Sequence, residues 1–289
     1  MEYEKIKFCA GVVTYNPDIK LLDRCIKSVY NQVQFIILID NGSKNISDIN
    51  SIKVMYPNVI LVANNENRGI SFALNQIANE AANKKIDWFL TLDQDSICPE
   101  NMISIFSEYA KIENVAIICP TIQLRIHNDE PIELEDSFEY VETAITSGCL
   151  VSTSYWEKAK GFWNYLFIDK VDDDFCYTVR ECGGKIIRTK AVKLEHEIGR
   201  PSIHSVFGMK FYTDSYPSFR YYYIARNTII VYSCHNDTGH KPWKILLKRG
   251  IKIIIGEKGK IDKLKCFVLG IIEGCKWKAR FGERGNPRV

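Results

Sequence analysis

One stretch at the end of the first third of the chain decides the fold, and it reads Phe89-Leu90-Thr91-Leu92-Asp93-Gln94-Asp95-Ser96. Its apolar and β-branched beginning favours a buried strand. Because alternate side chains of an extended chain point to the same side, Asp93 and Asp95 are expected to project together from the strand end. Such paired oxygen ligands suit a divalent cation, although Asp and Ser are also ordinary turn residues.

The composition is that of an ordinary globular protein. The chain has 289 residues, 46% hydrophobic and 25% charged, which suits one large α/β domain, alone or with a C-terminal extension. Ten cysteines occur without a Cys-x-x-Cys pair, which favours reduced thiols and a reducing compartment. The charged N-terminus is unlike a signal peptide, and no apolar run is long enough to span a bilayer.

Charge is divided unevenly along the chain. Residues 241–289 carry 14 Lys/Arg and 4 Asp/Glu, a local net charge of +10, which leaves −7 for the rest of a chain whose total is +3. A basic tail on an acidic body suggests contact with an anionic surface. An anionic membrane and a nucleic acid are two surfaces of that kind.

Strands and helices alternate through the first half of the chain. Helices are expected from Pro17, with Asn16 as the N-cap, from Ile70 and from Pro99. The repeated strand–turn–helix unit predicts an α/β fold whose Rossmann-like, mainly parallel sheet is covered by helices on both faces. Apolar runs bounded by polar turns predict the strands, at residues 7–15, 35–39, 59–63, 88–92, 115–119, 143–152 and 185–192.

Polar turns follow four of these strands. The carboxyl ends of parallel strands share one edge, and ligands of such sheets bind beyond it, so the four turns are expected to form one site. Neither Gly-x-Gly-x-x-Gly nor Gly-x-x-x-x-Gly-Lys-Ser/Thr occurs, which disfavours dinucleotide and P-loop chemistry. The turns are Thr14-Tyr15-Asn16, Asp40-Asn41, Asn67-Arg68-Gly69 and Asp93-Gln94-Asp95.

An acidic cluster marks the second half of the chain, where Asp169, Asp172, Asp173 and Asp174 follow an apolar approach and begin a predicted helix. Helix N-termini favour Asp through capping and the helix dipole. Four carboxylates in six residues nevertheless exceed what a cap requires. Crowded carboxylates raise one another's pKa, and a raised pKa suits a general base.

Two further residues have both a structural and a functional interpretation. His196, one of five histidines, is a metal ligand if it meets Asp93 and Asp95, and otherwise a hydrogen-bonded structural residue. Arg226 follows a run of tyrosines at the start of a predicted helix, and it either packs with them or faces an anionic phosphate.

Taken in order, these motifs resemble the family 2 inverting glycosyltransferases of the GT-A fold, and most of all bacterial rhamnosyltransferases of O-antigen and capsular polysaccharide synthesis. The resemblance covers nearly the whole chain, including residues 270–274 and 280–282. Each motif alone is weak, whereas eight in the same order are specific. They are Thr14-Tyr15-Asn16-Pro17, Asp40-Asn41-Gly42-Ser43, Asn67-Arg68-Gly69-Ile70, Leu92-Asp93-Gln94-Asp95-Ser96, Ser147-Gly148 and residues 167–172, 194–199 and 222–227.

The resemblance implies a donor site for a nucleotide sugar. Asp40 would accept the imino hydrogen of a thymine or uracil base, and Arg68 and Gly69 would border the nucleotide. The full set of implied donor-binding residues is Thr14, Asn16, Asp40, Asn41, Arg68, Gly69, Asp93, Gln94 and Arg226.

The resemblance also implies a metal site and a catalytic base. Asp93, Asp95 and His196 would hold Mg²⁺ or Mn²⁺, which neutralises charge on the leaving diphosphate. Asp172 matches the base that deprotonates the acceptor hydroxyl, with Asp169 and Asp173 as alternatives. The family often has Glu where this chain has Asp174, so the register of the base stays open.

The basic C-terminal region, residues 241–289, is expected to be helical and amphipathic and to follow a GT-A domain of residues 1–240. One interpretation is contact with the cytoplasmic leaflet that carries a polyprenyl-diphosphate-linked saccharide acceptor. The enzyme would then be cytoplasmic and peripherally associated with the inner face of the plasma membrane. Packing against the catalytic domain and an oligomer contact are the alternatives.

Three functions are compatible with the sequence. The first is metal-dependent transfer of L-rhamnose from dTDP-rhamnose to a lipid-linked saccharide. The second keeps the fold but uses UDP-galactofuranose or another UDP-hexose, because few pocket contacts discriminate sugars. The third is a non-catalytic nucleotide- or nucleic-acid-binding protein, which the acidic cluster at residues 169–174 disfavours. No nucleic-acid partner is therefore expected.

Overall fold

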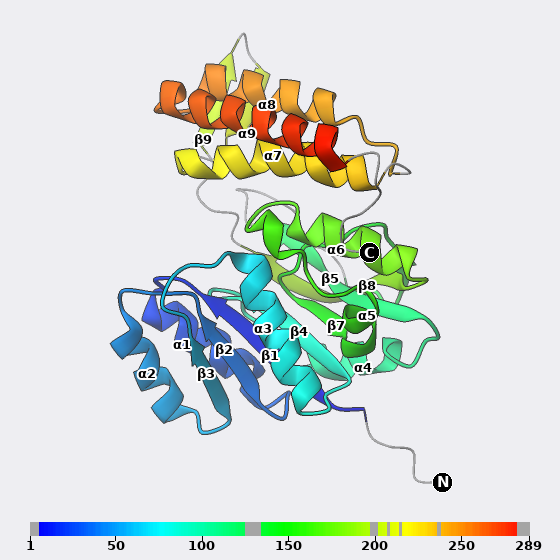
Figure 1. Cartoon of the computed structure of the whole chain (residues 1–289). Coiled ribbons are helices and arrows are strands. Elements are labelled where there is room, and N and C mark those ends of the chain that lie inside the picture. The colour runs from blue at the N-terminus through cyan, green and yellow to red at the C-terminus, as the bar shows by residue number, and fades with distance from the viewer. Residues whose placement is uncertain are drawn as a thin grey trace. The chain divides into compact units, whose positions relative to one another are not determined.

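The computed structural model describes residues 6–124, 134–196, 202–206, 209–213, 216–235 and 238–281 (Figure 1). Within these ranges it gives the backbone alone at 123–124, 195–196, 202–206 and 209–212. The chain forms two compact units. The first contains residues 1–164 and 175–196, and the second contains residues 165–174 and 197–289.

A sheet of eight strands, in the order β3-β2-β1-β4-β7-β5-β8-β6, is the centre of the first unit (Figure 1). The first four strands in this order pair in parallel, as do β5 and β8, whereas β7 and β6 are antiparallel to their neighbours. The expected α/β fold with a mainly parallel sheet is therefore confirmed. The strands are β1 (Phe8–Thr14), β2 (Ile36–Asp40), β3 (Val59–Ala63), β4 (Trp88–Asp93), β5 (Val115–Leu124), β6 (Phe138–Tyr140), β7 (Cys149–Ser152) and β8 (Lys185–His196).

Helices connect these strands, and two of them, α2 and α5, are not predicted from the sequence pattern. The pattern does not predict α2, which buries Ile49 and Ile52 and offers too few packed positions to show a helical period. The helices are α1 (Ile19–Tyr30), α2 (Ile46–Met55), α3 (Ile70–Asn83), α4 (Met102–Tyr109), α5 (Thr153–Lys158) and α6 (Val171–Glu181), with a 3₁₀ turn, η1, at Asn164–Leu166.

The start of α1 differs from the expectation at Asn16. Asp18 is the N-cap, since its Oδ1 accepts the backbone N–H groups of Lys20 and Leu21 at 2.9 and 3.2 Å. An Asp in this position satisfies two of the unpaired amides of the first turn. Asn16 instead has a positive φ of 47° and belongs to the turn that follows β1.

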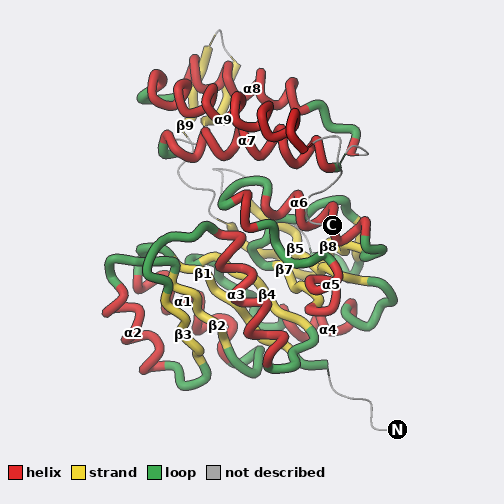
Figure 2. The backbone as a smooth tube through the Cα atoms, in the orientation of Figure 1, coloured by secondary structure: helices red, strands yellow, loops and turns green. Residues whose placement is uncertain are grey.

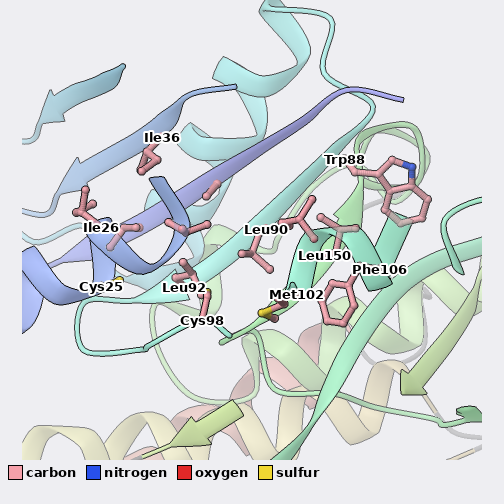
Figure 3. Packing of buried hydrophobic residues seen from close by; sticks show 14 of the residues in the cluster. Cys25, Ile26, Ile36, Trp88, Leu90, Leu92, Cys98, Met102, Phe106 and Leu150 are labelled. Carbon is pink, nitrogen blue, oxygen red and sulfur yellow. The ribbon is translucent and has the colours of Figure 1, made fainter. Parts of the chain in front are cut away.

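The main core of the first unit lies between one face of the sheet and α1, α2 and α4 (Figure 3). Alternate strand residues point into it, as the two-residue period of a strand requires. On the opposite face, a side chain at Gly11 of β1 would overlap Ile77, so a glycine lets α3 approach the strand closely. Labelled core residues in Figure 3 include Ile26, Ile36, Leu90, Leu92, Met102, Phe106 and Leu150.

Three helices form most of the second unit, together with the hairpin β9 (Ser202–Val206) and β10 (Met209–Thr213). They are α7 (Ser218–Cys234), α8 (Pro242–Gly256) and α9 (Lys260–Phe281), and they lie side by side in Figure 2. α7, which precedes the boundary expected at residue 240, thus clusters with the basic C-terminal helices. None of the described helices is both long and apolar enough to cross a bilayer.

Small residues bring α7 and α9 into close contact. A Cβ atom at Gly270 would overlap the Tyr222 carbonyl oxygen, and one at Gly274 would lie 3.0 Å from the Arg226 carbonyl oxygen. These glycines allow the two backbones to approach more closely than larger side chains permit. The hydrophobic cluster that the helices share contains Tyr221, Ala225, Ile229, Leu246, Ile253 and Phe267.

A buried ion pair closes the turn between α8 and α9. Glu257 is only 3% exposed, and its carboxylate accepts from Lys263 Nζ at 2.7 Å and from the Tyr221 hydroxyl. A carboxylate this deeply buried is tolerated because both of its oxygens have a donor.

Candidate functional site

The strand register brings the predicted turns to one edge of the sheet. Thr14 at the end of β1 is paired with Asp40 at the end of β2, and Asp40 is paired with Ala63 at the end of β3. On the other side of β1, Val13 is paired with Asp93 at the end of β4. Four neighbouring strands therefore end at one level, where the connecting turns can contribute to a common site.

The first two turns are fixed by buried side chains. Asp40, only 1% exposed, accepts the backbone N–H of Ser43 at 3.1 Å through Oδ2. The hydroxyl of Thr14, which is fully buried, donates to the Ile39 carbonyl at 3.3 Å. Asn16 accepts the Lys44 N–H at 2.9 Å, which ties the turn after β1 to the turn after β2.

Asn41 joins the turns that follow β2 and β3. Its amide nitrogen donates to Asn67 Oδ1 and to the Gly69 carbonyl, both at 3.1 Å, and its oxygen accepts the Arg68 N–H at 3.1 Å. Gly69, the N-cap of α3, has a positive φ of 85°. The exposed Arg68 side chain stacks its guanidinium 3.5 Å above the centre of the Phe72 ring.

The Asp93-Gln94-Asp95 segment forms a turn at the end of β4. Ser96 N–H donates to the Asp93 carbonyl at 3.2 Å, and Gln94 Oε1 accepts the backbone N–H of Tyr15 at 2.9 Å. Asp93 is half-buried and Asp95 is exposed. Gln94 thus fastens this turn to the turn after β1, and both carboxylates lie at the surface of the sheet edge.

Buried groups support the same turn from beneath. The Ser96 and Ser147 hydroxyls, both almost fully buried, lie 2.8 Å apart, and Cys25 Sγ donates to the Asp93 carbonyl at 3.4 Å. Burial, with contributions from Cys98, Asp93 and Asp95, raises the pKa of the Cys25 thiol well above its usual range. This thiol therefore stays protonated as a donor, a role that the sequence pattern gave no means to predict.

Asp93 and Asp95 have the chemistry that Mg²⁺ or Mn²⁺ prefers. They are carboxylates at the surface of one short turn, and hard cations favour oxygen ligands. Among the described residues, no group of three His, Cys, Asp or Glu side chains could hold a metal ion. His196 ends β8, but its side chain lies outside the described part of the chain. The fit therefore rests on the two aspartates.

The loop that leads into α6 is strained and belongs to the second unit. Phe167, Asp169 and Lys170 have positive φ values of 64°, 61° and 65°. Non-glycine residues adopt this region at a cost of about 1–2 kcal/mol each, and runs of them are found where surrounding contacts enforce the shape.

Side chains of α7 enforce that shape. The Asn227 amide nitrogen lies 2.7–2.9 Å from the carbonyl oxygens of Leu166, Ile168 and Asp169. Arg226 donates to the Tyr165 carbonyl at 2.6 Å and is 6% exposed. The structure therefore places Arg226, an expected donor-site residue, where it supports the loop that leads into α6, which we call the acidic loop (residues 165–170). Asn227 lies in the motif at residues 222–227, but this role for it was not predicted.

Three of the four clustered aspartates have charged or ionisable partners. Arg220 binds both oxygens of Asp169 at 3.0 Å, and the Lys170 ammonium lies 3.0 Å from Asp173. The buried Asp174 lies 3.2 Å from His235 Nε2. Arg220 also escaped the sequence analysis, although it lies seven residues before Asn227, on the same face of α7.

Asp172 differs from its neighbours. It is half-buried in the first turn of α6, and no described residue forms an ion pair with it. Burial, with the nearby charge of Asp173, raises the pKa of the Asp172 carboxyl to about 7. A carboxylate with such a pKa accepts a proton near neutral pH, which is what a general base requires.

The chain is similar to a known protein family and to a characterised relative. The model described as "Glycosyl transferase family 2" matches residues 9–179. A dTDP-rhamnosyl transferase of Shigella flexneri, RfbF, is 25% identical over 294 aligned positions, which cover 92% of this chain and 95% of that protein.

Solved structures show a similar fold. GalNAc-T7, determined with UDP, GalNAc and Mn²⁺, superposes with a TM-score of 0.62 at 14% identity, over 99% of this chain and 59% of that one. The mannosyltransferase PcManGT of Pyrobaculum calidifontis, determined with GDP-Man and Mn²⁺, superposes with a TM-score of 0.59 at 12% identity, over 97% of this chain and 76% of that one. S. aureus TarS gives 0.57 at 12% identity over 92% and 81%. These likenesses confirm the expected GT-A fold.

Proposed function

The chain belongs to glycosyl transferase family 2, and we propose that it transfers L-rhamnose from dTDP-rhamnose to a lipid-linked saccharide with inversion at the anomeric carbon. The donor is chosen from the likeness to RfbF, which extends over 92% of this chain and 95% of the relative. The observation that carries the catalytic part of the proposal is Asp172, whose pKa is raised to about 7.

Asp172 would act as the base in a single displacement. Its carboxylate takes the proton of the acceptor hydroxyl as that oxygen bonds to the anomeric carbon. The bond between that carbon and the diphosphate breaks, the bonding electrons leave with the diphosphate, and the configuration inverts. Asp169 and Asp173 are weaker candidates because each is paired with a cation, Arg220 and Lys170 respectively.

The turn after β4 would hold the divalent metal. Asp93 and Asp95 supply oxygen ligands, and Gln94 and Ser96 fix the turn that presents them. A bound Mg²⁺ or Mn²⁺ stabilises negative charge on the departing diphosphate as a Lewis acid. GalNAc-T7 and PcManGT were both determined with Mn²⁺, which supports metal dependence here.

The turns after β1, β2 and β3 would bind the nucleotide. Thr14, Asp40 and Asn41 are buried and hydrogen-bonded, so they would act by shaping the turns as well as by contact. Arg68 and Gly69 at the start of α3 would border the diphosphate, since helix N-termini favour anions. The acceptor would be a polyprenyl-diphosphate-linked saccharide at the cytoplasmic face of the membrane, with the enzyme bound peripherally.

A donor screen tests the proposal. The purified full chain is incubated with Mn²⁺ or Mg²⁺, a synthetic lipid-diphosphate saccharide and one of dTDP-rhamnose, UDP-galactofuranose or UDP-glucose. We expect acceptor-dependent release of dTDP from dTDP-rhamnose and little release from the UDP-sugars. If nucleotide is released from UDP-galactofuranose alone, that sugar nucleotide replaces dTDP-rhamnose as the proposed donor. If no donor supports transfer to any of a panel of acceptors, the enzymatic assignment is overturned.

Matched variants then test the residues. Asp172→Asn should abolish transfer and keep donor affinity, whereas Asp169→Asn should also disturb the loop that Arg220 holds. Full activity of Asp172→Asn would move the base to another aspartate of the cluster.

A further inference from the structure

Helix α8 has two apolar faces. One face packs in the second unit through Leu246 and Ile253, which are 2% and 0% exposed. The other face is exposed and carries large apolar side chains at helical spacing, from Trp243 at 56% and Leu247 at 67% exposure to Ile251 and Ile254. These positions fall at i, i+4, i+8 and i+11, which form one continuous stripe of a helix.

Helix α9 carries a second exposed stripe. Ile261, Val268 and Ile272 follow the spacing i, i+7 and i+11, and all three are exposed. Scattered apolar residues on a surface need no explanation, but stripes of them on two helices in contact mark an interaction surface. We call these two rows of exposed apolar residues, Trp243, Leu247, Ile251 and Ile254 of α8 and Ile261, Val268 and Ile272 of α9, the apolar stripes.

The charge beside the apolar stripes is almost entirely positive. On α8, Lys244, Lys248 and Lys252 recur every four residues beside the stripe, and α9 adds exposed Lys265 and Lys276. Of the acidic residues within α8, α9 and the turn between them, Glu257 is buried, Glu273 is half-buried and Asp262 is exposed. The surface thus combines apolar rows with basic rows.

We propose that the apolar stripes of α8 and α9 form an in-plane docking surface for an anionic lipid bilayer. The apolar side chains would enter the boundary between headgroups and acyl chains, while the lysines would reach anionic headgroups. Trp243 suits this boundary because its ring is apolar and its N–H is a donor. This inference names the surface for the membrane association in the proposed function, but it rests on residues outside the catalytic site.

A second copy of the chain fits the surface less well. A symmetric pair buries the same patch on both partners, so the lysine rows of the two copies would meet. Like charges brought together at an interface oppose association, and the described surface offers few carboxylates to compensate. An anionic membrane provides the opposite charge over the whole surface.

Vesicle flotation of the full chain tests the proposal, with phosphatidylcholine vesicles that contain either no anionic lipid or about 30% phosphatidylglycerol. We expect the chain to float with the anionic vesicles and to float several-fold less in about 0.5 M NaCl. The triple variant Trp243→Ser, Leu247→Ser, Ile251→Ser should float at least tenfold less. The matched control Val54→Ser, Met55→Ser removes exposed apolar residues of α2 and should float like the unmodified chain.

Circular dichroism and transfer to a water-soluble acceptor accompany each variant, so that folding and activity are known independently. Transfer without flotation overturns this inference alone, and flotation without transfer overturns the proposed function alone. Equal flotation of the triple variant and the control also refutes the docking surface. If the unmodified chain fails to float and is a dimer that the triple variant converts to a monomer, the surface binds a second copy instead.

Discussion

The substitution Asp173→Asn tests whether the acidic cluster tunes Asp172. The carboxyl of Asp172 has its pKa raised to about 7, first by burial and then by the charge of Asp173, while Lys170 acts in the opposite direction. A base must be deprotonated to work, so transfer should rise with pH through the pKa of Asp172. With that pKa, the active fraction is about 10% at pH 6, about 50% at pH 7 and about 90% at pH 8.

Asp173→Asn removes the like charge and keeps the size of the side chain. If the midpoint falls by about one pH unit, kcat/KM at pH 6 rises about fivefold relative to its plateau. Lys170→Gln should do the reverse, because it removes a cation and leaves Asp173 without its ion pair. A one-unit rise in the midpoint then lowers kcat/KM at pH 7 about fivefold relative to its plateau.

The assay is kcat/KM for dTDP release at constant ionic strength and saturating metal, from pH 5.5 to pH 9 in roughly half-unit steps. The opposite directions of the two shifts are decisive, because general damage to the loop would lower both plateaus without separating the midpoints. Unmoved midpoints in both variants would refute the electrostatic coupling. Complete loss of transfer in Asp173→Asn with activity retained in Asp172→Asn would make Asp173 the base.

Four further outcomes follow from the contacts described. Gly270→Ala should lower the free energy of unfolding by about 1–3 kcal/mol in urea titrations, since the new methyl group overlaps the Tyr222 carbonyl. Its control Gly250→Ala, whose Cβ would lie 3.6 Å from Phe267, should be neutral or stabilising by up to about 1 kcal/mol; equal losses would contradict the close α7–α9 contact. Lys263→Met should lower the free energy of unfolding by about 3–5 kcal/mol, because it leaves the buried charge of Glu257 without its cation. The double variant with Glu257→Gln should recover part of that loss, and a loss well below this range in Lys263→Met would show that the ion pair contributes little. Asp93→Ala should remove the Mn²⁺ dependence of donor binding measured by calorimetry, and unchanged metal dependence would exclude this residue as a ligand. The pKa of Asp172 in the folded chain lies above its ordinary value of 3.8, so its contribution to stability is present below about pH 4 and is lost as pH rises through about 7. Asp172→Asn should therefore flatten that part of the plot of unfolding free energy against pH. An unchanged plot would argue against the raised pKa.

The parallel half of the sheet could be predicted because its signals are local. Each strand is a short apolar run that ends on a polar turn, so β3 coincides with the predicted residues 59–63 and β4 extends the predicted strand by one residue to Asp93. The same reasoning brought the four turns to one edge. Helix α2 was not predicted because its two buried residues, Ile49 and Ile52, are too few to establish a helical period. The N-cap of α1 is Asp18, two residues after the expected Asn16, because both residue types are good N-caps.

Partners far apart in the chain could not be predicted. Nothing local to Asp169 indicates that Arg220, 51 residues later, will bind both of its oxygens. For Arg226 the sequence left two roles open, because a single guanidinium in a sequence looks the same whether it binds a ligand or a carbonyl oxygen. Its low exposure and its hydrogen bond to the Tyr165 carbonyl show that it supports the loop, and both appear only when the chain is folded.

The support of the acidic loop by α7 limits how such enzymes can be recombined. The loop lies within residues 9–179, the part that the family model matches, whereas Arg220 and Asn227 lie beyond it. A chimera joined at the end of the matched region would therefore graft one parent's loop onto the other parent's helix, and its strained turns would lose their hydrogen bonds. A junction that precedes residue 165 keeps this support, because loop and helix are then inherited together.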